Sequence, residues 1–364
     1  MRKVLFVTAL TCFLACSTSQ PVRNEVITQI EAALVQQPER TPLIYYLASL
    51  YAEQKNHAAA DRWLLRLEEL GWTQGVDFST SAVAKRLDAR VPVVSNSTVA
   101  FTLPERQLMA EGITYDPVDD VFYVGSMQQR KVLRVERNGR VTDFVTTRLR
   151  PLGMKVDAER RVLWVGAMGA DKGGDEGQAA LYRIDLRDGS IRTQERGSAT
   201  EPSLLNDIAI LEDGSVLVTD SLRGTIVDGS LQTWAEGFGY TNGIARDGHD
   251  LYVADFRGLT KFDLRTKART TLTPPPREHF AGIDGLTYHD GTLIGVQNTV
   301  GRPRIVRIHP ADNRLEVLES RNPHFEIPTT GTMAGEDYYF IANAQLRTKP
   351  EAMKETVVLR LKVP

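Results

Sequence analysis

The stretch TNGIARDGHDLYVADF, residues 241–256, combines a small residue, an apolar strand, a tight turn and a strand rich in apolar and aromatic residues. The same unit occurs six times between residue 95 and the end of the chain. The copies begin at Glu111, Leu152, Asn206, Asn242, Asp284 and Thr330. Their starts are separated by 36 to 54 residues, which is typical of blades in a β-propeller. We therefore expect an all-β, six-bladed β-propeller over residues 95–364.

The closure of this ring can also be predicted. The last copy supplies only three strands before the chain ends at Pro364. Residues 98–103, just before the first copy, have the composition of the missing outer strand. Joining both ends of the chain in one blade would leave no unpaired strand edge.

A segment of different character precedes the propeller. Residues 24–72 have helical periodicity, and six of them lie at the offsets of one tetratricopeptide repeat: Leu47, Ala48, Tyr51, Ala60, Leu64 and Leu67. We expect a small α-helical N-terminal domain here, with residues 73–94 as a polar connector. The domain is either a helical arm packed on the propeller or a module that docks a protein partner.

The N-terminus has the features of an export signal. Arg2 and Lys3 precede an apolar stretch, residues 4–15, that is too short to span a bilayer. The stretch ends in Phe13-Leu14-Ala15-Cys16, which resembles a bacterial lipobox. We expect residues 1–16 to be a lipoprotein-type signal peptide ending at a lipidated Cys16, with ordinary cleavage near Ala15 as the alternative. Ser17 favours an anchor at the outer membrane, facing the periplasm.

Composition excludes several other classes of function. The chain of 364 residues has 44 Lys and Arg against 46 Asp and Glu, so it lacks the basic excess of a nucleic-acid binder. Its two cysteines, Cys12 and Cys16, both lie near the N-terminus. The propeller can therefore contain no disulfide, zinc–thiolate site or cysteine nucleophile.

The first residues of the six copies form a column that predicts a cation site. In a propeller these positions converge on one face of the hub, and four of the six carry oxygen ligands: Glu111, Asn206, Asn242 and Asp284. Two carboxylates balance a divalent charge, and the absence of His and Cys favours Ca²⁺, with Mg²⁺ or Mn²⁺ possible. An open site of this kind suits Lewis-acid chemistry. The alternative is that these residues hydrate the hub or hold a structural ion.

Four stretches resemble the gluconolactonase / regucalcin (senescence marker protein) family and its paraoxonase-like relatives, which are six-bladed propellers that include lactonases. They are EGITYD at 111, LLNDIAILEDGSVLVTDS at 204, TNGIARDGHDLYVADF at 241 and IDGLTYHDGTL at 283. Their order and blade spacing make the resemblance specific for the family, over residues of about 100 to 345.

The resemblance implies roles for the column. Glu111, Asn242 and Asp284 would bind the metal, and Asn206 would bind the metal or its water and contact substrate. Asp284 would also be the catalytic base that activates the attacking water. The implied reaction is hydrolysis of a cyclic ester, with the metal stabilising the oxyanion.

Two positions depart from the family pattern. Sugar-lactonase members carry an arginine two residues before the Asn-Asp pair, where this chain has Leu204, and paraoxonase-like enzymes carry a histidine where this chain has Leu152. These leucines favour a less polar substrate. His279 and His324, in the connections that enter the fifth and sixth copies, are candidate substrate contacts or local hydrogen-bond partners. Asn298 either ends a strand, which the sequence favours, or points into the mouth of the hub.

The function that we expect is metal-dependent hydrolysis of a lactone or related ester, with calcium as the cofactor, a small molecule as the partner and a lipid anchor to the membrane. The main alternative is a non-catalytic propeller that binds a ligand or protein partner and holds a structural calcium ion. A third option is a related propeller chemistry of the strictosidine-synthase type.

Overall fold

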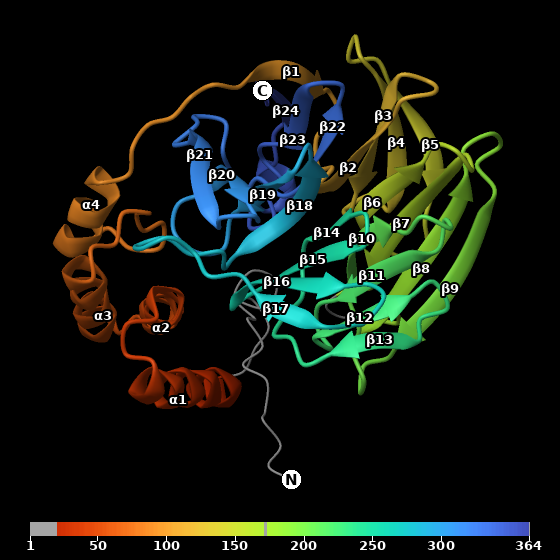
Figure 1. The fold of residues 1–364 in the computed structure, drawn as a ribbon. Coiled ribbons are helices and arrows are strands. Elements are labelled where there is room, and N and C mark those ends of the chain that lie inside the picture. Colours follow the sequence, from red (N-terminus) through yellow and green to blue (C-terminus); the bar gives the residue numbers. More distant parts are fainter. Residues whose placement is uncertain (1–19, 171–172, 364) are drawn as a thin grey trace.

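The computed structural model describes residues 20–170 and 173–363, so the expected signal peptide and Cys16 lie outside the described residues. The described strands form six four-stranded antiparallel sheets arranged in a ring (Figure 1). This confirms the predicted six-bladed β-propeller with helices in the N-terminal region.

Each blade contributes one strand to each of four layers. The innermost strands are β2 (Ala110–Asp116), β6 (Arg150–Asp157), β10 (Leu205–Ile210), β14 (Ile244–Asp247), β18 (Ile283–His289) and β22 (Gly331–Ala334). The second strands are β3 (Val121–Ser126), β7 (Val162–Met168), β11 (Val216–Asp220), β15 (Asp250–Asp255), β19 (Thr292–Gln297) and β23 (Asp337–Ile341). The third strands are β4 (Lys131–Glu136), β8 (Gln178–Asp185), β12 (Thr225–Asp228), β16 (Gly258–Asp263), β20 (Arg304–His309) and β24 (Thr356–Lys362). The outer strands are β5 (Val141–Thr146), β9 (Ile191–Gly197), β13 (Thr233–Glu236), β17 (Arg269–Thr271), β21 (Arg314–Ser320) and β1 (Thr98–Leu103).

The two ends of the propeller meet in the sixth blade, as predicted. β1 pairs with β24 in antiparallel register, from Thr98 opposite Arg360 to Leu103 opposite Thr356. The strand order in this sheet is β1-β24-β23-β22, so the first strand of the propeller completes the last blade. A short 3₁₀ helix, η1 (Pro350–Ala352), lies in the connection between β23 and β24.

Alternation along the second strands explains how neighbouring blades adhere. In β3, Phe122 packs with Tyr339 of blade 6 at a ring-centroid distance of 4.7 Å, whereas the next residue, Tyr123, packs with Met154 and Leu163 of blade 2. Side chains of a strand point to opposite faces with a period of two, so each sheet supplies apolar side chains to both neighbours. Complete burial of one such side chain contributes about 1.5–3 kcal/mol.

Within the described residues, four helices precede the propeller: α1 (Gln20–Gln36), α2 (Thr41–Glu53), α3 (His57–Glu69) and α4 (Ala82–Ala89). Pro42 lies in the first turn of α2, and the Asn56 side chain caps α3 by accepting a hydrogen bond from the Ala59 N–H. α4, capped by Ser81, is an addition to the prediction, which treated residues 73–94 as connector only. We call residues 20–94 the helical arm. None of the helices in the described chain is long and apolar enough to cross a membrane.

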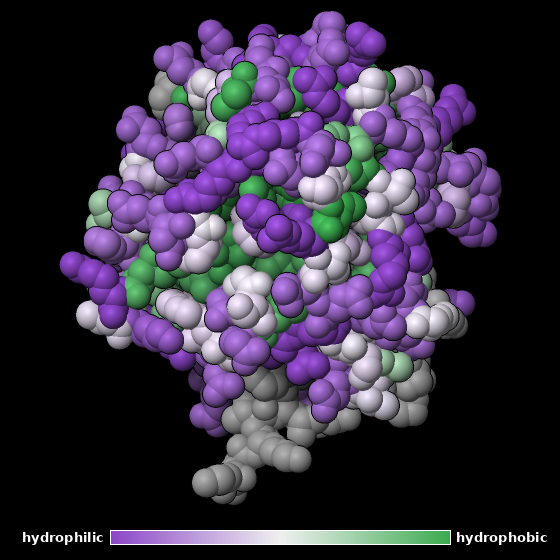
Figure 2. All heavy atoms as spheres, turned by 90° about the vertical axis from the view of Figure 1, so that its right-hand side faces the viewer, coloured by the Kyte–Doolittle hydropathy of each residue, from purple (hydrophilic) through white to green (hydrophobic). Residues whose placement is uncertain are grey.

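The helical arm packs on the propeller. One buried cluster joins arm residues such as Tyr45, Leu47 and Trp72 to Ala281 and Val300 of the propeller. Figure 1 shows the arm beside blades 4 and 5, at one side of the ring. The side of the molecule away from the arm is mostly hydrophilic, with hydrophobic residues visible in a recess across its middle (Figure 2). Of the two sequence alternatives for the helices, packing on the propeller is observed; the tetratricopeptide resemblance and protein docking stay predictions.

Candidate metal centre at the hub

The column of first residues lies on one face of the propeller, which we call the hub face. Successive strands run antiparallel, so the start of each innermost strand lies beside the end of the second strand; Ala110 of β2, for example, pairs with Ser126 of β3. Connections that leave the second strands, and those that enter each blade, therefore lie on the hub face as well. Segments that are far apart in the sequence can contact the column there.

A β-bulge presents the column residue in four blades. In blade 1, Ala110 pairs with Ser126 and Ile113 pairs with Val124, so Glu111 and Gly112 together face the single residue Gly125. The same shift occurs at the hub end of β6, β10 and β18. In blade 4, the Asn242 N–H donates to the Ala254 carbonyl and the Ala254 N–H donates to the Gly243 carbonyl. Bulges re-aim side chains and are common beside active sites.

The column residues form a closed ring. A Cβ added at Gly112, Gly153 or Gly243 would lie 2.1, 2.6 or 2.6 Å from a backbone carbonyl oxygen of the next blade, that of Leu152, Asn206 or Asp284 respectively. Only glycine permits this approach of neighbouring blades. The ring closes where the Thr330 hydroxyl donates to the Glu111 carbonyl at 2.7 Å.

Glu111 is a buried carboxylate without a counter-charge. Its side chain is 3% exposed, and its Oε2 atom has no hydrogen-bond partner. Burial, followed by the charges of Asp284 and Asp207, raises the pKa of Glu111 well above its usual range. A cation at this position would remove both costs, because it would pair the charge and satisfy the free oxygen.

Asp284 is the second carboxylate of the ring. Its Oδ2 atom accepts a hydrogen bond from Asn298 Nδ2 at 2.5 Å, and the Asn242 side chain also hydrogen-bonds to it. Burial raises the pKa of Asp284 to about 7, against the opposing effect of these hydrogen bonds. Asn298 therefore both follows β19 and points at the column, which the sequence left open. Its Oδ1 atom is buried without a partner.

Asn206 and its neighbour Asp207 occupy the third blade's position in the ring. Asn206 Nδ2 donates to the Ser221 hydroxyl at 3.1 Å, which orients the amide. Asp207 is a buried acid that the sequence analysis did not single out. It accepts backbone N–H groups of Ile208 and Ile244. The sequence signal was available: the other five copies have glycine at this position.

The donor set of the ring fits a hard divalent cation. It comprises two carboxylates and two amides, and it includes an orphaned carboxylate oxygen. Among the described residues, no group of three or more His, Cys, Asp or Glu is arranged to hold a metal ion. The ring has only two carboxylates among its four expected ligands, so a site here would depend on amide oxygens for the remainder.

An apolar cluster borders the ring on the side of blades 1 to 3. Its buried members are Met127, Leu152, Met168 and Leu204. Leu152 is itself the column residue of blade 2, and Leu204 lies two positions before Asn206. Both sequence departures from the family pattern therefore belong to one surface next to the candidate cation site. We call these four residues the methionine–leucine wall.

The contacts of the two candidate histidines are with residues outside the ring. His279 is 3% exposed, stacks on Trp72 of the arm at a ring-centroid distance of 5.5 Å and contacts the Ala281 carbonyl through Nδ1 at 3.0 Å. Burial, followed by the charge of Arg304, lowers the pKa of His279 well below its usual range. His324 is exposed, and its backbone N–H donates to Asn322. These contacts match local hydrogen bonding; substrate contact by either histidine stays a prediction.

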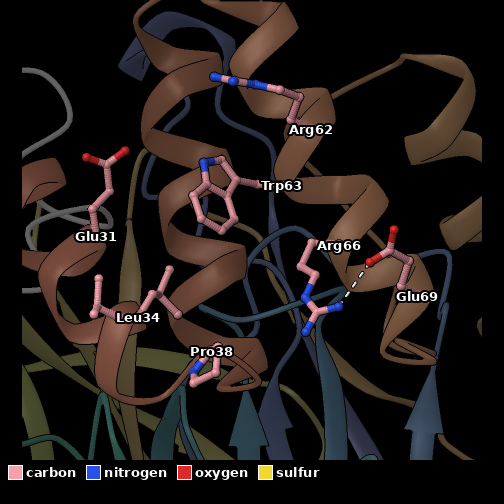
Figure 3. A pocket seen from close by; sticks show the side chains of 8 residues that line it. Glu31, Leu34, Pro38, Arg62, Trp63, Arg66 and Glu69 are labelled. Carbon is pink, nitrogen blue, oxygen red and sulfur yellow. Dashed lines mark hydrogen bonds and ion pairs between the residues drawn. The ribbon is translucent and has the colours of Figure 1, made fainter.

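The arm carries a groove of its own, away from the ring. It has a volume of about 610 Å³ and lies between α1 and α3, and its lining includes Leu34, Pro38, Trp63, Arg62 and Glu31 (Figure 3). Arg66 at the rim forms an ion pair with Glu69 at 3.0 Å. This groove is the described surface on which the docking alternative would depend.

Comparison with known proteins shows the fold. No family model and no curated protein matches this chain. A gluconolactonase from Xanthomonas campestris is similar in structure, with 18% identity, a TM-score of 0.55, and coverage of 75% of this chain and 91% of that one. A calcium-binding protein, regucalcin, from Agrobacterium tumefaciens has 14% identity and a TM-score of 0.54, with coverage of 74% and 96%.

The same fold also carries other activities. A PQQ-bound aldose sugar dehydrogenase from Streptomyces coelicolor has 14% identity and a TM-score of 0.51, with coverage of 74% of this chain and 99% of that one. At such identities the similarity concerns the fold, and activity must be argued from the site. The structure thus has the six-bladed propeller fold of gluconolactonase-like and regucalcin-like proteins, as the sequence resemblance predicts.

Proposed function

We propose that this protein is a metal-dependent hydrolase of a lactone or related ester, with its reaction centre at the hub. The main support is the pair of buried carboxylates, Glu111 and Asp284, whose pKa values burial raises and whose ring includes an oxygen without a partner. Such a pair is costly to maintain in the folded protein unless a ligand compensates it. The similarity in fold to a gluconolactonase agrees with this proposal.

Each ring residue has a role in the proposed site. Glu111, Asn206, Asn242 and Asp284 would hold the cation, for which Ca²⁺ is the best match to an all-oxygen donor set. A divalent cation supplies Lewis-acid polarisation of an ester carbonyl when it is bound. Asp284 would also accept the proton of the attacking water, and Asn206 would contact the substrate from the amide position that Ser221 orients.

The methionine–leucine wall supports a substrate less polar than a sugar lactone. Leu152 and Leu204 offer no hydrogen bond to hydroxyl groups, and Met127 and Met168 extend the apolar surface. Burying a polyhydroxylated ring against such a surface would leave its hydroxyl groups without partners, which is unfavourable. We therefore infer that the preferred substrates are lactones or esters with an alkyl substituent.

The test is hydrolysis of a lactone panel, measured as proton release with calcium or with a chelator. The panel runs from gluconolactone to γ- and δ-lactones with alkyl substituents. Glu111→Gln and Asp284→Asn are expected to lower kcat at least about 100-fold, because each removes a charged ligand. Glu212→Gln is the matched control, since Glu212 is exposed on the surface of blade 3.

The alternative, a propeller that binds a ligand around a structural calcium ion, predicts a different result. The protein would bind calcium in calorimetry and lose that binding in Glu111→Gln, yet no panel member would be hydrolysed. Turnover that is unaffected by chelator and by both variants would also contradict the proposal.

We also propose that the protein is exported and anchored by a lipid on Cys16 at the outer membrane. The support is the sequence of residues 1–17 alone. Cys16→Ser is expected to move the protein from the membrane fraction to the soluble fraction of the cell envelope. An unchanged membrane association in this variant would contradict the lipid anchor.

A further inference from the structure

The connection between β19 and β20 links the helical arm to the candidate cation site. We call residues 298–302 the blade 5 loop. Its first residue, Asn298, is 6% exposed, and its Nδ2 atom donates to Asp284 Oδ2 at 2.5 Å and to the Pro328 carbonyl at 2.7 Å. These two bonds fix the amide and, through it, the carboxylate of Asp284.

The remainder of the blade 5 loop is held by the arm. The Tyr46 hydroxyl of α2 hydrogen-bonds with the Thr299 hydroxyl at 3.2 Å, one residue after Asn298. The backbone N–H of Arg302 donates to the Gln74 carbonyl at 2.6 Å. The Arg302 guanidinium forms an ion pair with Asp88 of α4 at 2.8 Å.

Close backbone packing makes this contact specific. Gly301 has φ of +79°, and a Cβ added there would lie 2.8 Å from the Gln74 carbonyl oxygen of the arm. Val300, between Thr299 and Gly301, is buried in the cluster that contains the core of the arm. The loop therefore has apolar burial, a backbone hydrogen bond and an ion pair on its arm side.

A partly buried polar network also links the arm to the residue that precedes the blade 5 loop. Gln74 Nε2 of the arm donates to Glu278 Oε2 at 3.1 Å, and Arg304 donates to the same oxygen at 2.8 Å. Arg304 Nε also donates to Gln297 Oε1 at 2.7 Å, and Gln297 immediately precedes Asn298. The arm thus contacts both sides of Asn298 along the chain, through Thr299 and through the network that ends at Gln297.

We propose that the helical arm positions Asp284 for the cation through the blade 5 loop, with Asn298 as the positioning residue. The arm then contributes to cation binding at the hub, although none of its residues is a ligand. The solved propellers that resemble this protein match only about three quarters of the chain, the share that residues 95–364 make up. This inference rests on the proposed function in one respect only, namely that Asp284 ligates a divalent cation.

Calcium affinity measured by calorimetry tests the proposal without relying on turnover. Tyr46→Phe removes only the hydroxyl group that meets Thr299 and is expected to raise the calcium Kd about 3- to 10-fold, the worth of one hydrogen bond. Tyr51→Phe is the matched control on the same helix, because its hydroxyl bonds Glu31 within the arm at 2.7 Å. We expect no change in the Kd for this control.

A double variant tests whether the effect passes through Asn298. Asn298→Ala is expected to raise the calcium Kd about 10- to 100-fold, as removal of a partner of a metal ligand does. In the Asn298→Ala background, Tyr46→Phe should have no further effect on the Kd, because the route to Asp284 is already broken. Unfolding midpoints of all variants separate a local effect on the site from a general loss of stability.

Two results would overturn the inference. One is a Kd for Tyr46→Phe equal to that of Tyr51→Phe, and the other is full additivity of Tyr46→Phe and Asn298→Ala. A protein that binds calcium with the expected pattern of Kd values but hydrolyses no lactone would contradict the proposed hydrolase and support the positioning role of the arm. Absence of calcium binding in the unaltered protein would overturn both.

Discussion

The two sides of the hub face differ in chemistry. On the side of blades 1 to 3, the methionine–leucine wall borders the ring, and Leu152 occupies a column position that carries an oxygen ligand in four other blades. On the side of blades 4 and 5, Asn242, Asp284 and Asn298 form a hydrogen-bonded group that the helical arm supports from outside. The oxygen ligands of the ring thus lie on both sides, with Glu111 and Asn206 beside the wall, whereas the apolar surface that can hold an alkyl group lies on the side of blades 1 to 3. We call that side the apolar half and the side of blades 4 and 5, which the arm contacts, the supported half.

This difference shows that equivalent positions of one repeated unit can carry different chemistry. Six similar blades place six equivalent positions around one axis, and substitutions at those positions determine the chemistry of the hub without altering the fold. The arm contacts the supported half, at blades 4 and 5. The predictions below test each half in turn, beginning with the largest effect that we expect.

The stability of the contact between the arm and the supported half should depend on Trp72. This side chain is 1% exposed, stacks on His279, and its Nε1 donates to the Gly75 carbonyl at 2.8 Å. Trp72→Ala is expected to lower the free energy of unfolding by about 3–5 kcal/mol, as measured by urea titration. Trp63→Ala, on the half-buried groove of the arm, should cost clearly less. Equal losses for both tryptophans would mean that the contact with the propeller does not stabilise the arm.

The packing of blade 3 against blades 4 and 5 should depend on Asp207. Its carboxylate accepts the N–H of Ile244 at 3.2 Å and also hydrogen-bonds the backbone of Leu286, so it joins blade 3 to blades 4 and 5. Asp207→Ala leaves these buried donors without an acceptor and is expected to cost about 2–4 kcal/mol of stability. Asp312→Ala, at an exposed turn, is the control. Thermal unfolding that is the same for both variants would contradict this role of Asp207.

The apolar half should set the substrate preference through Leu204. Leu204→Asn replaces an apolar side chain with a polar one of similar size, and it is expected to lower the ratio of kcat/KM for alkyl lactones over gluconolactone about 10-fold. Leu204→Met keeps the side chain apolar and should leave the ratio nearly unchanged. Steady-state kinetics on both substrates provide the measurement. A ratio of kcat/KM values that stays constant in Leu204→Asn would show that the methionine–leucine wall does not contact the substrate.

Acid should lower the free energy of unfolding through the protonation of His279. Burial, followed by the charge of Arg304, lowers the pKa of His279 in the folded protein, whereas the unfolded chain binds a proton at about pH 6.5. The unfolded state therefore binds more protons below that pH, and stability falls as the pH falls, by at most about 1.4 kcal/mol per pH unit. Above about pH 6.5 the contribution of His279 is complete.

The comparison of His279→Asn with the unaltered protein isolates this contribution. Urea unfolding between pH 7 and pH 5 should show a shallower decline for the variant, because Asn does not titrate. The ionised carboxylates of the protein contribute equally to both curves. Parallel curves would show that His279 has the same proton affinity in the folded and unfolded states.

Much of the propeller could be predicted from the sequence because its information is local and repeated. Hairpin turns, alternating apolar residues and a fixed spacing identify each blade without knowledge of the others. Residues 98–103 could be assigned to the last blade because a ring must leave no edge, and the structure pairs them with β24 in that way. The column of Glu111, Asn206, Asn242 and Asp284 followed from the same alignment.

The remaining features depend on contacts between segments that the sequence does not place together. Asp207 was not predicted because the column was defined by the first residue of each copy, and Asp207 is the second residue of its copy. The contact of Asn298 with Asp284, 14 residues apart, occurs where a bulge at the hub end of β18 presents Asp284. The position of α4 in the polar connector follows from packing against α3 and the ion pair with Arg302, since its eight residues are too few for a stable isolated helix.

By itself, the sequence therefore determined the number of blades, their closure and which residue types occupy the column at the hub, because these follow from periodicity and from residue type. Only the tertiary structure decided that the helical arm packs beside blades 4 and 5, that His279 stacks on Trp72, and that the blade 5 loop connects the arm to Asp284. The contacts of Trp72 with His279 and of Tyr46 with Thr299 join residues more than 200 positions apart in the chain. Their formation depends on the surface shape that the completed ring presents, which no local pattern encodes.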